Sequence, residues 1–314
     1  MTGLTYDDQP YWRNIQRHLP ERLHLVGDEL PSEEQWAWRG HSVHIDRYPR
    51  PAAPVKLVQL HGVGTNGRMM TTIVGAPMRD RGVEPIGMDL LGYGQTTVAK
   101  GHNWSYGDWI DQVVDFLAHE RTRDDRPIVL YGLSAGGMLA YQVAAIDQRV
   151  AGIVGTCFMD QQVWKVRWQT ARFGPVGACF PLIGGPLTRV AGVVKVPVAL
   201  AGKMKALVNS RAALRDCLAD PTSAGNWVSV KFLDEYMNAV PATEPEDFAV
   251  CPILLTQPTA DRWTPLNIST TFLDRVRRVP VTAVMLDGAG HYPLEEPALT
   301  QLPDAIDEFC RKVG

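Results

Sequence analysis

The chain has 314 residues, of which 45% are hydrophobic and 21% charged, and its formal net charge is −3. This length fits one α/β domain with an insertion, and the apolar content is enough for a large core. A net negative chain has no general attraction for nucleic acid, so no nucleic-acid partner is expected.

The N-terminal residues, the lengths of the apolar runs and the number of cysteines indicate the cellular compartment of the protein. The first residues, MTGLTYDDQPYWRN, contain no apolar core, and no apolar run is long enough to span a membrane. We therefore expect neither a secretory signal nor a transmembrane helix. The five cysteines are an odd number without paired spacing, which predicts buried thiols in a reducing, cytoplasmic environment.

Strands and helices are expected to alternate along most of the chain. Residues 36–48 predict an antiparallel hairpin, and apolar runs predict strands near 55–60, 83–88, 127–131, 150–156, 251–256 and 281–286. Helical periodicity occurs near 69–80, 106–120, 136–147, 266–278 and 298–312. This alternation predicts an α/β fold with a mostly parallel, twisted sheet of about eight strands flanked by helices.

A glycine-rich turn follows the first of the expected parallel strands. Its residues GVGTNG (62–67) fit G-x-G-x-x-G, and Asp89 ends the next strand, so the segment taken alone matches a dinucleotide-binding fingerprint. That alternative explains none of the serine, aspartate and histidine motifs further along the chain. We therefore expect no cofactor.

The most informative motif is GLSAG (132–136), which places Ser134 between a β-branched strand and a helix of small residues. A lone G-x-S-x-G is weak, but this strand–turn–helix context is typical of a nucleophile elbow, in which a sharp turn exposes the serine hydroxyl. Glycines stand on either side because a Cβ there would meet neighbouring backbone. Ser134 is the expected nucleophile.

The regular alternation breaks over residues 160–245, which we expect to form a helical cap (lid) inserted into a core of residues 1–159 and 246–314. From Asp160 to Asp216 the chain has two acidic and nine basic residues, an excess of +7 in a net negative chain. The basic residues are Lys165, Arg167, Arg172, Arg189, Lys195, Lys203, Lys205, Arg211 and Arg215.

Aromatic and apolar residues lie between these charges, among them Trp164, Trp168, Phe173 and Phe180. The combination predicts attraction to an anionic amphiphile, or peripheral contact of the cap with a lipid surface. The alternative is that the apolar residues pack the cap onto the core while the charges are solvated.

Two loops near the C-terminus carry the expected partners of the serine. Asp261 follows the strand near 251–256, and His291 follows the strand near 281–286. Parallel sheets place their sites at these carboxyl ends. A histidine can take the serine's proton near neutral pH, and a carboxylate can orient the imidazole. Asp160 remains a second candidate for that carboxylate, whereas Asp287 is expected to belong to the turn.

The remaining candidate residues complete a site for acyl transfer. Backbone N–H groups of Val63 and Ala135 are expected to form the oxyanion hole. Trp164, Trp263 and Tyr292 are expected to line the substrate pocket. His61 and His102 are expected to be structural, and no His, Cys and Asp cluster has metal-ligand spacing, so no metal is expected.

These residues resemble the α/β-hydrolase superfamily, in particular its monoacylglycerol lipase and lysophospholipase-like serine esterases. The matching segments are LHGVG (60–64), DLLGYGQT (89–96), GLSAGG (132–137), TADRWTP (259–265) and GAGHYPLEEP (288–297). The resemblance implies an α/β-hydrolase fold, a Ser-His-Asp triad and ester substrates. The sequence departs from the family pattern in the first fifty residues and in the insertion, where no motif matches.

The expected activity is cleavage of a carboxylic ester of a small molecule or lipid through an acyl-enzyme, with a monoacylglycerol- or lysophospholipid-like substrate. The same triad could serve thioesters, amides, carbon–carbon bonds or acyl transfer, because fold and triad do not fix the substrate. A low-turnover ligand-binding protein on the same scaffold is the alternative from another class.

Overall fold

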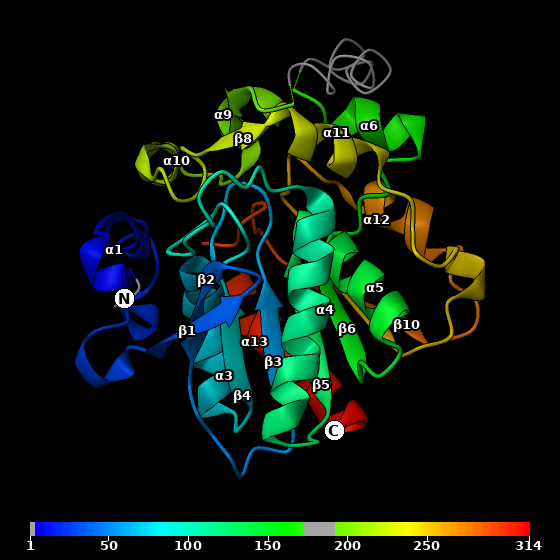
Figure 1. Cartoon of the computed structure of the whole chain (residues 1–314). Helices are drawn as coiled ribbons and strands as arrows, with labels where there is room; N and C mark the ends of the chain where they lie inside the picture. Colours follow the sequence, from blue (N-terminus) through cyan, green and yellow to red (C-terminus); the bar gives the residue numbers. More distant parts are fainter. Residues whose placement is uncertain (1–3, 173–191) are drawn as a thin grey trace.

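The computed structural model describes residues 4–172 and 192–314. Its centre is an eight-stranded sheet (Figure 1). The strands lie in the order β1 (Ser32–Trp38), β2 (His41–Arg47), β4 (Glu84–Met88), β3 (Lys56–Leu60), β5 (Ile128–Leu133), β6 (Gly152–Thr156), β9 (Ile253–Pro258) and β10 (Val281–Leu286).

The pairs β1–β2 and β2–β4 are antiparallel, and every pair from β4 to β10 is parallel. The predicted strands and fold class are confirmed. The residues of β3, β4, β5, β6 and β9 are all buried, as expected for parallel strands covered on both faces.

Helices cover both faces of the sheet. α4 (Tyr106–Arg123) and α5 (Ala135–Asp147) pack side by side on one face, while α3 (Ala76–Asp80) packs with α13 (Ala298–Val313) on the other (Figure 1). α2 (Gly67–Met70) leads into α3 through the π-helical turn η4 (Thr71–Gly75).

α12 (Leu266–Leu273) is shorter than the helix predicted over 266–278. Its end tightens into i→i+3 hydrogen bonds, from Arg275 N–H to Phe272 O and from Val276 N–H to Leu273 O. Pro280 then disfavours helical backbone at the residue before it, and the chain enters β10.

Residues 160–245 lie between β6 and β9. Their described part contains α6 (Trp164–Thr170), β7 (Lys195–Pro197), α9 (Val198–Ala201), η5 (Met204–Ala206), α10 (Arg211–Ala219), β8 (Trp227–Ser229) and α11 (Val230–Asn238), and η6 (Pro245–Asp247) begins at their last residue. The expected helical insertion also contains one antiparallel pair of short strands, β7 and β8, which the sequence analysis did not predict. Strands of three residues are too short to show an alternating pattern. Phe173, Phe180 and Arg189 lie outside the described residues.

The N-terminal residues, for which the sequence offered no motif, form short elements beside β1. These are η1 (Tyr6–Asp8), α1 (Tyr11–Gln16), η2 (Glu21–Leu23) and η3 (Gly27–Glu29). α1 packs against α10, so this segment contacts the insertion as well as the core. Tyr6, Trp12, Leu25, Tyr48 and Ala76 form a small apolar cluster of its own.

The described cysteines agree with the sequence prediction. Cys157, Cys217, Cys251 and Cys310 are buried free thiols, and Cys179 lies outside the described residues. Within residues 4–172 and 192–314, no helix combines the length and apolar character needed to cross a bilayer.

Candidate active site

Ser134 occupies the sharp turn between β5 and α5. Its backbone angles, φ 58° and ψ −120°, are unusual for a residue with a side chain. The flanking glycines allow the turn to pack closely. A Cβ on Gly132 would lie 2.1 Å from the carbonyl oxygen of Gly136, and a Cβ on Gly136 would lie 2.3 Å from that of Leu60. This close approach is the physical reason for glycine at both positions.

Asp261 and His291 come together from the loops that follow β9 and β10. His291 Nδ1 lies 2.8 Å from Asp261 Oδ2. The other carboxylate oxygen accepts hydrogen bonds from the backbone N–H groups of Trp263 (2.7 Å) and Thr264 (2.9 Å). The turn after Asp261 therefore fixes the orientation of the carboxylate, which accepts a hydrogen bond from the imidazole.

The electrostatics of this pair favour an ionised carboxylate. Burial alone would raise the pKa of Asp261, but the charge of His291 and the hydrogen bonds from His291 and Thr264 hold that pKa well below its usual range. An ionised Asp261 accepts a hydrogen bond from the Nδ1–H group of His291, which leaves the Nε2 lone pair of His291 free. Nε2 is buried and has no hydrogen-bond partner among the described residues.

Ser134 and His291 both follow the carboxyl ends of parallel strands. Because Nε2 lacks a partner, the serine hydroxyl and the imidazole are not hydrogen-bonded to each other in this structure. Catalytic hydrogen bonds of enzymes without ligand are often long and tighten when substrate binds.

Val63 and Ala135, the expected oxyanion donors, lie beside Ser134. Val63, Ser134 and Ala135 line one cavity together. Within residues 4–172 and 192–314, the N–H groups of Val63 and Ala135 donate no hydrogen bond. The Val63 loop lies against the elbow, since a Cβ on Gly62 would be 2.7 Å from the carbonyl oxygen of Leu133.

The cavity beside Ser134 has a volume of about 300 Å³ and largely apolar walls. Residues 160–245 supply much of its lining, including Leu200, Val230, Leu233 and Met237. Trp263 also lines it, as expected. Its indole N–H donates to Thr170 O of α6 (3.1 Å), and its ring lies 4.8 Å from the His291 imidazole, centroid to centroid.

Two expected pocket residues do not line this cavity. Trp164 lies on the outer face of α6 and is 45% exposed, whereas Val166 and Thr170 form the inner face. Tyr292 is fully buried and its hydroxyl donates to Met69 O (3.0 Å), so it is a core residue. Sequence position alone did not reveal the direction of either side chain.

The alternative carboxylates lie elsewhere. Asp160 approaches Arg275 (3.8 Å) and accepts from the N–H of Gln162, and burial raises its pKa. Asp287 is bonded to Gln301 at the surface. Of the described carboxylates, it is Asp261 that hydrogen-bonds His291.

His61 and His102 have structural partners. His61 Nδ1 lies 2.9 Å from Gly62 O and Nε2 accepts from Leu90 N–H (3.0 Å), while burial lowers its pKa to about 4. His102 lies 3.2 Å from Asp108.

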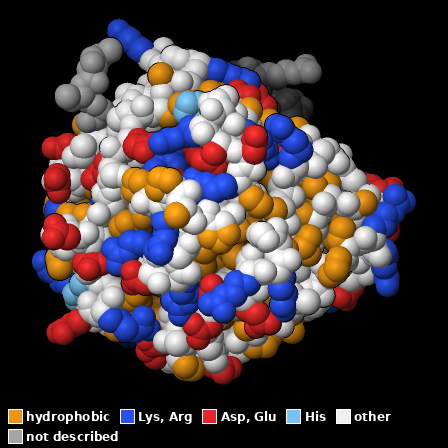
Figure 2. Space-filling model, turned by 90° about the horizontal axis from the view of Figure 1, so that it is seen from below, with side chains coloured by type: hydrophobic (Ala, Val, Ile, Leu, Met, Phe, Trp, Pro, Cys, Tyr) orange, Lys and Arg blue, Asp and Glu red, His pale blue; other side chains and the backbone are white. Residues whose placement is uncertain are grey.

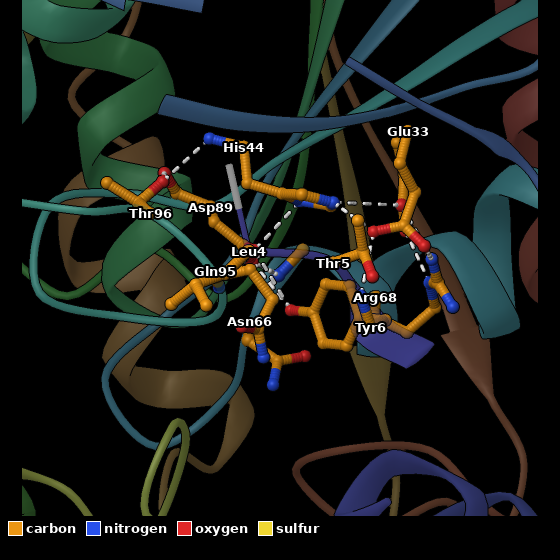
Figure 3. A network of polar contacts seen from close by, with 12 residues as sticks. Leu4, Thr5, Tyr6, Glu33, His44, Asn66, Arg68, Asp89, Gln95 and Thr96 are labelled. Atoms are coloured by element: carbon orange, nitrogen blue, oxygen red, sulfur yellow. Dashed lines mark hydrogen bonds and ion pairs between the residues drawn. The ribbon is translucent and has the colours of Figure 1, made fainter. Parts of the chain in front are cut away.

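Asp89, the acidic residue of the dinucleotide alternative, is fully buried and already bonded (Figure 3). It accepts from the N–H groups of Gly67 (2.7 Å) and Gln95 (2.8 Å), and His44 Nδ1 lies 3.0 Å from it. Its oxygens are engaged inside the fold, so they are not presented to a ribose.

Glu33, His44 and Asp46 place possible metal-ligand atoms close together. The Arg68 guanidinium already pairs with Asp46 (2.6 Å) and Glu33 (3.1 Å), while His44 Nε2 lies 2.6 Å from Glu33. The protein's own cations therefore neutralise these carboxylates.

A family model described as serine aminopeptidase, S33, matches residues 52–298. The chain belongs to this family. The match includes the elbow, the Val63 loop, and the Asp261 and His291 loops, and it leaves the N-terminal elements outside.

Known relatives agree with this assignment. Phospholipase YtpA from Bacillus subtilis (strain 168) is 31% identical over 122 residues, which cover 38% of this chain and 42% of that protein. The chain thus matches less than half the length of this relative. Monoglyceride lipase from Saccharomyces cerevisiae aligns with a TM-score of 0.73 at 14% identity, over 94% of this chain and 98% of that chain.

Monoacylglycerol lipase from Paleococcus ferrophilus aligns with a TM-score of 0.66 at 17% identity, over 87% of this chain and 99% of that chain. These structures share the fold of this chain. The resemblance to lipase- and esterase-type α/β-hydrolases is confirmed.

Thr264 is a site residue that the sequence analysis missed. Its hydroxyl lies 2.6 Å from Asp261 Oδ2 and 3.0 Å from His291 Nδ1. The spacing Asp-x-x-Thr is typical of a local turn in which an aspartate accepts from the following backbone, so a signal was present. The contact with His291 was not encoded locally.

Proposed function

We propose that this hydrolase cleaves carboxylic esters, with Ser134 as nucleophile, His291 as general base and acid, and Asp261 as the residue that orients His291. One observation supports the proposal most strongly. His291 is held by Asp261 with its Nε2 lone pair free, and Ser134 lies on the wall of an apolar cavity.

In the proposed reaction, Ser134 Oγ attacks the ester carbonyl carbon as its proton moves to His291 Nε2. The N–H groups of Val63 and Ala135 stabilise the negative oxygen of the tetrahedral intermediate. His291 then protonates the departing alcohol. Water attacks the acyl-enzyme by the same route and releases the acid.

The cavity supports an acyl-lipid ester as substrate. Its walls are largely apolar, and burial of each CH₂ group there stabilises the complex by about 0.8 kcal/mol. The names of the similar proteins, a phospholipase and two monoacylglycerol-type lipases, agree with such a substrate.

The nucleophile is tested with Ser134→Ala. We expect the variant to keep its fold and to lose nearly all turnover of p-nitrophenyl esters and labelling by a fluorophosphonate probe. Retained turnover would exclude Ser134, and a wild-type protein that resists the probe would favour the ligand-binding alternative.

The amide alternative deserves a direct comparison because the family description names an aminopeptidase. p-Nitrophenyl octanoate and octanoyl p-nitroanilide carry the same acyl group. The first contains an ester bond and the second an amide bond. We expect a clear preference for the ester. A preference for the anilide, or for the matching thioester, would replace the ester assignment with an amidase or thioesterase.

We propose further that the alcohol part of the substrate is anionic, which refines the lipid-ester assignment. Two grooves share wall residues with the cavity, and every ionisable residue that lines them within residues 4–172 and 192–314 is basic. These residues are Lys165, Arg172, Lys203, Lys205 and Arg262. Two of them have neutral partners, since Lys203 donates to Gln169 O and Arg262 to Asn209 Oδ1.

The opposite face of the molecule differs. Seen from below, basic and acidic side chains lie intermixed (Figure 2). Because Lys203 and Arg262 donate to neutral oxygens among the described residues, a phosphate group there would gain charge-assisted hydrogen bonds.

Monomeric substrates separate a headgroup effect from a membrane effect. KM is measured for octanoyl glycerol phosphate and octanoyl glycerol below the concentration at which they form micelles. The proteins compared are the wild type, the double variant Lys203→Gln/Lys205→Gln and the control variant Arg149→Gln. Arg149 is exposed and follows the far end of α5, about 20 Å along the helix from Ser134.

We expect the double variant to raise KM for the phosphate ester about tenfold and to leave the neutral ester unchanged. Equal KM values for the two esters in wild type would exclude an anionic preference. An effect seen solely with anionic vesicles would assign the cations to membrane contact instead.

A further inference from the structure

We infer that Tyr6 and Gln9, in the N-terminal segment, are positioning residues of the active site: they hold the end of the loop that carries Val63. This inference rests on the proposed function, because it takes the Val63 N–H as an oxyanion donor. Both residues lie outside the family match, which begins at residue 52.

The Val63 loop, residues 61–67, is anchored at its end by two side chains. Gly67 N–H donates to Asp89 Oδ1 (2.7 Å). Asn66 Nδ2 reaches Thr222 Oγ1 (3.3 Å) and Asp220 Oδ2 (3.4 Å), while Asn66 Oδ1 accepts from Met69 N–H and caps α2. The position of the loop end therefore depends on Asp89 and on the 220–222 turn.

Tyr6 bonds the first of these anchors (Figure 3). Its hydroxyl lies 2.9 Å from Asp89 Oδ1 and 3.0 Å from Oδ2, and both residues are fully buried. The carboxylate that holds Gly67 thus receives a donor from a residue more than eighty positions away in the chain. Removing that donor leaves a buried charge with one hydrogen bond fewer.

Gln9 bonds the second anchor. Its Nε2 donates to Thr222 Oγ1 (2.8 Å) and to Asp220 Oδ1 (3.3 Å), the same two side chains that Asn66 contacts. Its Oε1 accepts from Trp12 N–H (3.2 Å), which fixes the orientation of the amide. Gln9 is 5% exposed, so water does not readily replace it.

The segment that presents these two donors is itself held in place. Tyr6 N–H donates to Glu33 Oε2 (2.8 Å) of β1, and Trp12 Nε1–H donates to Tyr6 O (3.0 Å). The Arg68 guanidinium, paired with Asp46, lies 4.4 Å above the Tyr6 ring. These contacts place both donors at anchor residues of one loop, which favours a role in positioning over a general role in stability.

The test compares two hydroxyl deletions of the same chemistry. Tyr6→Phe removes the contact with Asp89. Tyr48→Phe is the matched control, because Tyr48 belongs to the same small apolar cluster but its hydroxyl donates to Glu29 O (2.6 Å). Gln9→Met removes the contacts with Thr222 and Asp220 and keeps a side chain of similar volume. It tests the inference independently if Tyr6→Phe fails to fold. The measurements are kcat, KM, the melting temperature and the affinity for n-butylboronic acid, which forms a tetrahedral adduct with a reactive serine.

We expect Tyr6→Phe and Gln9→Met each to lower kcat for p-nitrophenyl butyrate about 5- to 50-fold with KM nearly unchanged, and to weaken boronic acid binding by a similar factor. Tyr48→Phe is expected to lower the melting temperature alone. Wild-type kcat in both folded test variants would overturn the inference and leave the ester-hydrolase assignment intact. Activity that persists in Ser134→Ala would instead remove the proposed function.

Discussion

The hydroxyl of Thr264 donates a 2.6 Å hydrogen bond to Oδ2 of Asp261, the oxygen that also lies 2.8 Å from His291 Nδ1. Two donors converge on one carboxylate oxygen that is buried together with the imidazole. Thr264 thereby restricts where the carboxylate can point.

We predict that Thr264→Val lowers kcat about tenfold and leaves KM nearly unchanged, because a hydrogen bond to a charged group contributes about 1.5–3 kcal/mol. Thr264→Ser should retain most of the activity, since it keeps the hydroxyl. Steady-state kinetics on a p-nitrophenyl ester measure both values. Equal activity of the valine and serine variants would contradict a role for the hydroxyl.

Gly62 is expected to be intolerant of a side chain. A Cβ there would lie 2.7 Å from Leu133 O and 2.8 Å from Ser134 Cβ, so the Val63 loop would have to move away from the elbow. We predict that Gly62→Ala lowers kcat about 100-fold or more, as the loss of an oxyanion donor does. Gly107→Ala is the control, because its Cβ would make ordinary contacts of 3.6 and 3.7 Å. Similar kcat values for the two variants would refute the prediction.

His44 should make the free energy of unfolding decrease as the pH becomes alkaline. Burial alone would lower its pKa, but hydrogen bonds to Asp89 and Glu33 and the charges of Asp89 and Asp46 raise it to about 10. The folded state therefore holds a proton that the unfolded state releases near pH 6.5, so this contribution is complete below about pH 6.5 and is lost as pH rises toward about 10.

His44→Gln removes that titration. We expect its melting temperature to be lower than that of wild type at pH 7 and the difference to shrink as pH approaches 10. Thermal unfolding at several pH values between 6 and 10 provides the measurement. A difference that stays constant over this range would show that the His44 proton does not stabilise the fold.

Leu233 should control the acyl chain length that the cavity accepts. It lines the apolar cavity from α11, and a larger side chain there would take up part of the volume of about 300 Å³. We predict that Leu233→Trp lowers kcat/KM for p-nitrophenyl decanoate about tenfold while p-nitrophenyl acetate is cleaved as before. Val240→Trp, at a residue 65% exposed, is the control and should leave the ratio unchanged. A parallel loss on both esters would argue against this location of the acyl chain.

The sequence by itself determined the sheet, the flanking helices and the elbow at Ser134. These features leave short-range patterns in the sequence. Burial on both faces makes β5 largely apolar, and Gly132 is required because a Cβ there would meet the carbonyl oxygen of Gly136, four residues further along. Such local constraints leave a pattern in the order of residues.

Only the tertiary structure decided which carboxylate meets His291, which aromatic side chains line the cavity, and what the N-terminal segment contacts. Asp160 and Asp261 both follow strands, yet it is Asp261 that lies beside His291, because β9 is the neighbour of β10. The Tyr6–Asp89 contact joins elements that no spacing relates. Contacts of this kind depend on strand order and side-chain direction, which arise when distant segments pack against one another.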